Sequence, residues 1–198
     1  MSSLLVATNN AGKLREISSI IADPSIALLT LSDVGITSDI EETGQTFEEN
    51  SAMKAAAYAR RAGLLTLADD SGLVIDHLGG GPGVRSARYA GEGASDADRI
   101  EKVLGEMKGS TTRTARFICV VTLSNPAGKI VESVGGRCEG TIVDVPRGSF
   151  GFGYDPIFLP DGFDKTFGEL DAETKNRISH RAIALAKIIP FLRGFFKI

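Results

Sequence analysis

Short apolar runs alternate with stretches of helical spacing through the first half of this chain, and this alternation constrains its fold more than any other feature. Strands separated by helices favour parallel pairing, because a parallel connection needs a crossover segment. Two later apolar runs flank Asn125–Gly128, whose residue types predict a tight turn and therefore an antiparallel hairpin. The predicted fold class is α/β with a mixed sheet. The predicted strands cover residues 4–7, 26–31, 64–68, 114–124, 129–134 and 140–145. The predicted helices cover a segment that follows residue 13, residues 46–63 and residues 95–108. A last predicted helix begins near Ser179, and Pro190 kinks or ends it.

Length and charge narrow the class of protein. The 198 residues fit one compact domain, and two lobes that share a core also fit this length. A net charge of -3 argues against a general affinity for nucleic-acid backbones, which requires a basic face. No apolar run approaches the roughly 20 residues that cross a bilayer, and residues 1–7 lack the features of a signal peptide. The two cysteines, Cys119 and Cys138, lack metal-ligand spacing and indicate a reducing compartment. We therefore expect a cytoplasmic protein with no nucleic-acid or membrane partner.

Two adjacent carboxylates, Asp69 and Asp70, follow a short apolar run, and Ser71-Gly72 is expected to break the strand after them. Negative charge at the end of a buried strand is costly unless a cation neutralises it. Hard divalent ions such as Mg²⁺ prefer carboxylate oxygens and often bring a phosphate substrate with them. Taken alone, the stretch is also consistent with a solvated Asp-Ser-Gly turn, which is the commoner structure.

The loop Thr8–Lys13 joins a predicted strand to a predicted helix. Exposed amides at a helix N-terminus, together with a lysine, can bind oxyanions. The glycine spacing of a Walker A loop is absent, so this is not that motif. An ordinary strand-to-helix turn with a solvated lysine explains the same residues equally well.

Two further segments carry residues suited to a nucleotide. Glycines alternate with aromatic residues in Phe150–Pro156, which leaves rings accessible for a planar base, although an aromatic corner of the core has the same pattern. Three cations and a histidine crowd Lys175–Arg181, at a predicted helix start where the dipole disfavours positive charge. An anionic ligand explains that crowding, and a solvated basic face is the alternative. Gly83–Tyr89 contains two more arginines and can be either a phosphate contact or a surface loop.

Taken in order, these blocks resemble the inosine triphosphate pyrophosphatase family, which hydrolyses aberrant purine nucleoside triphosphates. The resemblance covers essentially the whole chain. The matching blocks are Thr8–Lys13, Glu41–Gly44 with Phe47–Asn50, Ala68–Gly72, Gly80–Gly83 with Ser86–Arg88, and Phe152–Pro156 with Ser179–Arg181. Thr174 departs from the pattern, since many members of the family carry an acid there, and we expect that position to be peripheral.

The resemblance implies a fold, a reaction and a cofactor. It implies an α/β fold with two lobes around a long curved mixed sheet, a nucleotide cleft between the lobes, and a homodimer. Residues 1–198 then form a single nucleoside triphosphate pyrophosphatase domain. The implied reaction is the Mg²⁺-dependent hydrolysis of ITP, dITP or XTP to the nucleoside monophosphate and pyrophosphate, which removes these nucleotides from the pool.

The same resemblance implies roles for individual residues. Asp70 is the expected catalytic residue, which accepts a proton from water and also binds the metal together with Glu42. Asp69 and Glu41 receive no definite role, because an acid next to a functional residue can serve simply to adjust the local charge. The implied substrate-binding residues are Thr8, Asn9, Asn10, Ala11, Gly12, Lys13 and Ser71 for the triphosphate, and Phe152, Gly153, Tyr154, Asp155, Lys175, His180 and Arg181 for the nucleoside and its base.

Two other functions remain open from the sequence. One is a pyrophosphatase for modified pyrimidine or other nucleotides, which the segment Ser179–Arg181 disfavours because it matches the family's base-reading end. The other is a nucleotide sensor without catalysis, which the presence of both Asp70 and Glu42 disfavours.

Overall fold

A computed structural model of the chain describes residues 2–197. The backbone packs into two compact units, as the two-lobe expectation predicts. Unit 1 contains the residues up to Asp70, Cys119–Gly136, and the residues from Arg181 onward, and unit 2 contains Ser71–Ile118 and Arg137–His180. Two of the predicted site blocks therefore contribute residues to both units, because the chain passes from one unit to the other between Asp70 and Ser71 and again between His180 and Arg181.

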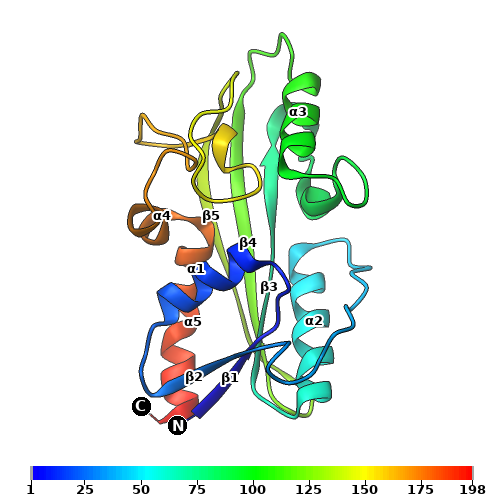
Figure 1. The fold of residues 1–198 in the computed structure, drawn as a ribbon, viewed down its shortest axis with the longest axis vertical. Helices are drawn as coiled ribbons and strands as arrows, with labels where there is room; N and C mark the ends of the chain where they lie inside the picture. Colours follow the sequence, from blue (N-terminus) through cyan, green and yellow to red (C-terminus); the bar gives the residue numbers. More distant parts are fainter. Residues whose placement is uncertain (1, 198) are drawn as a thin grey trace. The chain divides into compact units, whose positions relative to one another are not determined.

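The strands of the described residues form a six-stranded sheet in the order β2-β1-β3-β4-β5-β6 (Figure 1). Strand β1 pairs in parallel with β2 and with β3, whereas β5 and β6 are antiparallel. The predicted α/β class with a mixed sheet is confirmed. The strands are β1 (Ser2–Val6), β2 (Ile26–Thr30), β3 (Thr66–Ile75), β4 (Thr114–Ser124), β5 (Ile130–Ile142) and β6 (Phe158–Pro160), and the α-helices are α1 (Ala11–Ile21), α2 (Phe47–Ala62), α3 (Asp96–Glu106), α4 (Ala172–Ile178) and α5 (His180–Phe196). Short 3-10 helices cover Asp76–Leu78, Gly83–Arg88 and Asp155–Ile157.

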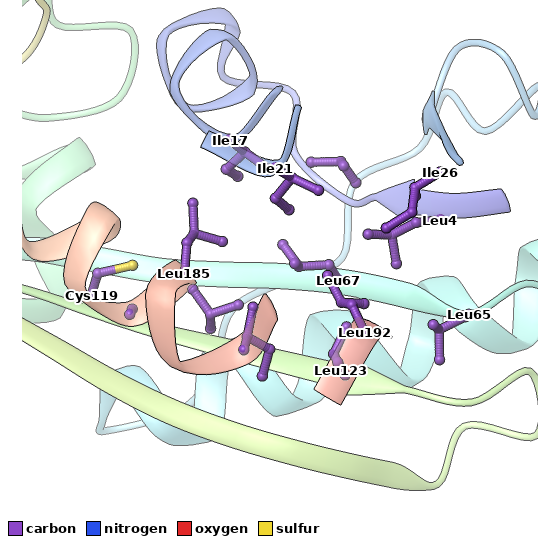
Figure 2. Close-up of a cluster of buried hydrophobic side chains, with 14 residues drawn as sticks. Leu4, Ile17, Ile21, Ile26, Leu65, Leu67, Cys119, Leu123, Leu185 and Leu192 are labelled. Atoms are coloured by element: carbon purple, nitrogen blue, oxygen red, sulfur yellow. The ribbon is translucent and has the colours of Figure 1, made fainter. Parts of the chain in front are cut away.

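The alternation of side chains along the strands buries both faces of the sheet in unit 1. Leu4 and Leu67 belong to a cluster with Ile17 of α1 and Leu185 of α5, which Figure 2 shows. Their strand neighbours point the other way, and Leu5 packs in a second cluster with Ala55 and Tyr58 of α2. Helices therefore cover each face, as parallel strands with apolar runs require.

Unit 2 has its own core around Phe117 of β4. The Phe117 ring lies 4.7 Å from the Phe158 ring centroid and 6.1 Å from that of Phe167. Ile100 and Val103 of α3 belong to the same cluster. This aromatic core supports the turn at residues 151–155 described below.

Two strands differ from the sequence prediction in where they begin and end. Strand β3 does not break at Ser71-Gly72 but continues to Ile75, because Leu73 and Ile75 resume the buried alternation beyond the glycine. Strand β5 is one strand where two were predicted at residues 129–134 and 140–145, since it has a strand neighbour on each side. Both strands contain glycines, which also favour turns, and this is why the sequence predicted a break in each.

The last helix differs in a related way. Helix α5 does not end at Pro190 but continues to Phe196. Pro190 is exposed, and so is Ala186 one turn earlier, so the helical hydrogen bond that proline removes lies on an exposed face of the helix. Helix α4 was not predicted, and it begins where the Asp171 side chain accepts a hydrogen bond from the Thr174 N–H.

Candidate active site

Asp69 and Asp70 lie on opposite faces of β3, because successive strand side chains alternate. Asp69 shares the face of Leu67, toward α1 and α5, and Asp70 shares the face of Ala68, toward α2. Both carboxylates are buried. Each therefore meets a different set of partners within unit 1.

The Asp69 carboxylate is surrounded by cations. Its Oδ2 atom lies 3.1 Å from Lys13 Nζ and accepts hydrogen bonds from Arg181 Nε at 3.3 Å and from the second Arg181 nitrogen at 3.2 Å. Burial opposes ionisation of Asp69, but the charges of Lys13 and Arg181 outweigh it and lower the pKa of this carboxyl below its ordinary value. Asp69 is therefore a fixed anion that holds two cations in place.

Arg181 completes this buried cluster through a second carboxylate, since its guanidinium also pairs with Glu16 of α1. The Arg181 side chain is almost fully buried. Burial disfavours its charge, but Asp69 and Glu16 outweigh that effect and raise the pKa of Arg181. The guanidinium links α5, β3 and α1.

The negative charge of Asp70 is offset less strongly than that of Asp69. Its Oδ2 accepts a hydrogen bond of 3.1 Å from Asn50 Nδ2, and Lys54 Nζ lies 3.7 Å from its Oδ1. Lys54 is closer to Glu42, at 2.6 Å from Oε1. Burial and the neighbouring Glu42 raise the pKa of Asp70, and Lys54, Lys13 and Asn50 only partly offset them. A carboxyl with a raised pKa is a stronger base once it is ionised.

Helix α2 places Asn50 and Lys54 on the same face, one turn apart. The helix begins at its N-cap residue Thr46, whose side chain accepts the Glu49 N–H at 3.1 Å. Asn50 Oδ1 in turn accepts the Gly44 N–H at 2.8 Å. A Cβ at Gly44 would lie 2.6 Å from Asn50 Oδ1, so only glycine allows this approach. Asn50 thus connects the loop that carries Glu42 to Asp70.

The loop Thr8–Lys13 has the predicted strand-to-helix geometry. Val6 of β1 pairs with Leu67 of β3, so the loop after β1 starts beside the acidic pair. The Asn10 side chain caps α1 by accepting the Lys13 N–H at 3.0 Å. The amides at this N-terminus and the ammonium of Lys13, which lies beside Asp69, are groups of the kind that can bind an anion.

The second group of predicted residues lies in unit 2, in a turn from Gly151 to Asp155. Asp155 Oδ2 accepts the Phe152 N–H at 2.8 Å and pairs with Lys175 Nζ. That ammonium lies 4.8 Å from the Phe152 ring centroid, within the range of a cation–π contact. A Cβ at Gly151 would lie 2.0 Å from Asp155 Oδ2, so a side chain there would displace the carboxylate.

Tyr154 anchors this turn in the core of unit 2, where His180 is also buried. The His180 ring is buried and stacks on Phe117 with centroids 4.7 Å apart. Tyr154 donates its hydroxyl to the Ser86 carbonyl at 2.9 Å. Ser86 in turn accepts the Leu73 N–H of β3, which joins the Gly83–Arg88 segment to the strand.

Comparison with known proteins adds to this geometry. The Ham1 family matches residues 4–191. The chain belongs to this family. The dITP/XTP pyrophosphatase of Bacillus subtilis is 50% identical over 196 residues, which is 98% of each chain, and that of Geobacter sulfurreducens is 48% identical over 188 residues, which is 94% of each chain.

Solved structures of Ham1 proteins have the same fold. The Coxiella burnetii protein matches with a TM-score of 0.89 at 41% identity, over 98% of this chain and 100% of that one. The Staphylococcus aureus Ham1 protein matches with a TM-score of 0.87 at 41% identity and the same coverage. The family predicted from the motifs is confirmed.

Within this Ham1-family chain, the predicted residues fall into two groups. Unit 1 contains Thr8, Asn9, Asn10, Ala11, Gly12, Lys13, Glu42, Asp70 and Arg181, and unit 2 contains Ser71, Phe152, Gly153, Tyr154, Asp155, Lys175 and His180. The role of Arg181 in base recognition stays a prediction, and the contacts described above join it to Asp69 and Glu16.

Sequence reasoning assigned no role to Asn50, Lys54 or Glu16, which contact the predicted residues directly. Asn50 and Lys54 could have been found, because their spacing of four places them on one helix face behind a capping box. Glu16 could not, since its partner Arg181 lies 165 residues further along the chain.

Two searches of residues 2–197 complete the description. In this range there is no group of three or more His, Cys, Asp or Glu side chains arranged to hold a metal ion. Among the same residues, no helix is both long enough and apolar enough to cross a membrane.

Proposed function

We propose that this chain hydrolyses noncanonical purine nucleoside triphosphates, namely dITP, XTP and ITP, to the nucleoside monophosphate and pyrophosphate. The observation that carries the proposal is the Asp70 centre. A buried carboxyl with a raised pKa lies beside Lys54, and Lys13 lies beside the adjacent Asp69, in a chain half identical to a protein named dITP/XTP pyrophosphatase. A base and cations at one place suit the hydrolysis of an anionic anhydride.

In this proposal Asp70 orients the attacking water and accepts its proton. The water must approach a polyanion, so positive charge has to offset the repulsion before attack is favourable. Lys13, Lys54 and the α1 N-terminus supply that charge within unit 1. Lys54 stays protonated, because the neighbouring carboxylates outweigh its burial and raise its pKa.

The donor set of unit 1 fits Mg²⁺. Glu42 and Asp70 both approach the ammonium of Lys54, so a cation already lies next to both carboxylates. Mg²⁺ is commonly held by one or two carboxylates together with substrate phosphates, so a cluster of three protein ligands is not required. Glu42 and Asp70 would hold the ion, which would neutralise phosphate charge when bound.

The groups of unit 2 suit the nucleoside. The half-buried Phe152 ring offers a stacking surface, and Lys175 adds a buried cation held by Asp155. Hypoxanthine and xanthine carry an oxygen at position 6, where adenine carries an amino donor. A protein donor directed at that position is satisfied by the oxygen and left unpaired by adenine, which costs binding energy. His180 of unit 2 and Arg181 of unit 1 are the proposed donors.

We further propose that the protein acts in the cytoplasm as a homodimer. The homodimer rests on the family resemblance described above, and the location rests on the two cysteines without metal-ligand spacing, which indicate a reducing compartment. Size-exclusion chromatography with light scattering measures the oligomeric state directly.

A nucleotide panel tests the proposed function. The purified protein is incubated with Mg²⁺ and each of dITP, XTP, ITP, dATP, GTP and dUTP, and pyrophosphate release is followed. The proposal predicts the highest kcat/KM for dITP, XTP and ITP. A preference for dUTP would support the pyrimidine alternative, and tight binding without release of pyrophosphate would support the sensor.

A further inference from the structure

The turn that carries Phe152 is held by two carboxylates rather than one. Gly151 and Gly153 both have left-handed backbone angles, with φ of 74° and 62°. The two residues that follow Gly151, Phe152 and Gly153, each donate their backbone N–H to a carboxylate. The Phe152 N–H donates to Asp155 Oδ2 at 2.8 Å, and the Gly153 N–H donates to Asp96 Oδ2 at 2.6 Å. A turn with two glycines is flexible by itself, so these bonds define its conformation.

Asp96 reaches the turn from the first residue of α3, 57 residues away in sequence. It is not needed to cap that helix. The capping box of α3 consists of Ser95 and Asp98, which satisfy each other's N–H groups at 2.8 and 3.2 Å. The carboxylate of Asp96 is therefore available for a tertiary contact.

Arg99 fixes the orientation of Asp96. Its guanidinium pairs with the other oxygen of Asp96, and it also donates to the Ala87 carbonyl at 3.0 Å and the Ala94 carbonyl at 2.6 Å. Each Asp96 oxygen thus has one defined partner in unit 2. The result is a continuous chain of polar contacts from Arg99 through Asp96 of α3 to the Gly153 amide.

We propose that Asp96 is a positioning residue for the nucleobase, which acts by fixing the Gly153 amide and hence the Phe152 ring. This inference rests on the proposed function, in which Phe152 stacks on the base. Asp96 lies outside the motif blocks that carry the family resemblance, and it reacts with nothing itself. Its loss weakens substrate binding and leaves the chemical step at Asp70 in unit 1 unchanged.

Three variants test this role. In Asp96→Ala the Gly153 N–H loses a charged acceptor, so the KM for XTP and dITP rises about tenfold while kcat is retained. In Asp96→Asn the side-chain oxygen still accepts this hydrogen bond, so KM returns most of the way to the wild-type value. Asp98→Ala is the matched control in the same helical turn, and it lowers thermal stability without changing KM.

A second readout does not depend on activity. The Gly153 amide, followed by ¹⁵N NMR, exchanges its hydrogen about tenfold faster in Asp96→Ala than in the wild type, and keeps its protection in Asp98→Ala. An unchanged KM or an unchanged Gly153 exchange rate in Asp96→Ala overturns the inference, and so does an Asp96→Asn variant as impaired as the alanine variant. The KM outcomes presuppose an active wild-type enzyme, whereas an inactive wild type overturns the proposed function itself and leaves the exchange measurement to test the Asp96 contact.

Discussion

Two neighbouring aspartates in this protein have opposite pKa shifts, and the pleat of one strand explains the difference. Asp69 points toward Lys13 and Arg181, whose charges lower its pKa. Asp70 points toward α2, where burial and Glu42 raise its pKa against the effect of Lys54. The sequence shows only two adjacent acids. The fold makes one of them a fixed counterion and the other a candidate base.

Replacement of Asp70 by asparagine tests this assignment at the residue scale. Asp70→Asn keeps the volume and the capacity to accept a hydrogen bond but removes the charge and the basicity. Turnover of dITP is expected to fall about 100-fold or more, the usual effect of losing a general base. Thermal stability is expected to change little, because Lys54 keeps Glu42 as its partner. Asp69 is unsuitable as a comparison, since its loss leaves buried cations unpaired.

Arg181 gives a second prediction at this scale, on stability. Arg181→Ala leaves Asp69 and Glu16 buried beside one cation fewer, so the free energy of unfolding is expected to fall by about 3–5 kcal/mol. Urea denaturation measures the change. Arg177→Ala is the control, because Arg177 is exposed and pairs with exposed Glu173 one turn away, and surface changes of this kind stay within about 0.5 kcal/mol.

The same Arg181 variant separates stability from base recognition. If Arg181 reads position 6 of the base, the ITP-to-ATP preference narrows in Arg181→Ala. If its contacts with Asp69 and Glu16 are its only role, activity on both nucleotides falls by the same factor. Steady-state kinetics on the two substrates, measured well below the unfolding transition, distinguishes these results.

At the scale of elements, the start of α2 links local sequence to the site. Thr46 caps the helix that places Asn50 and Lys54 beside Asp70. Thr46→Ala removes the acceptor for the Glu49 N–H and is expected to lower the free energy of unfolding by about 1 kcal/mol. Thr46→Ser keeps the hydroxyl and should restore most of the loss. Equal stabilities of the alanine and serine variants in urea denaturation would contradict the capping role.

The ends of helices with capping residues could be predicted from the sequence. The ends of strands could not, because they depend on hydrogen bonds to neighbouring strands. The N-cap residue Thr46 and the αL glycine at Gly63 locate both ends of α2 in the sequence, as the structure confirms. Gly72 in β3 and the glycines of β5 are residues that also favour turns, but at these positions hydrogen bonding to neighbouring strands keeps the chain extended. Pro190 also led to a wrong prediction. It was expected to kink or end the helix, but α5 continues past it because the proline lies on an exposed face.

At the scale of the whole molecule, the sequence predicts the α/β class, the mixed sheet and the family, because these depend on alternation, turn residues and ordered motifs. It does not predict which acid meets which cation. Arg181 and Glu16 are far apart in sequence, and so are Asp96 and Gly153, so only the folded chain pairs them. The division of the site residues between two units is likewise a property of the chain path.

The most direct test of the account is the identity of the products from dITP. Wild-type protein is incubated with dITP and Mg²⁺, and the phosphorus-containing species are followed by ³¹P NMR, with Asp70→Asn as the parallel sample. The account predicts dIMP and pyrophosphate in equal amounts from the start of the reaction, and almost no product from Asp70→Asn. Accumulation of dIDP and single phosphate, or full activity of Asp70→Asn, would contradict it.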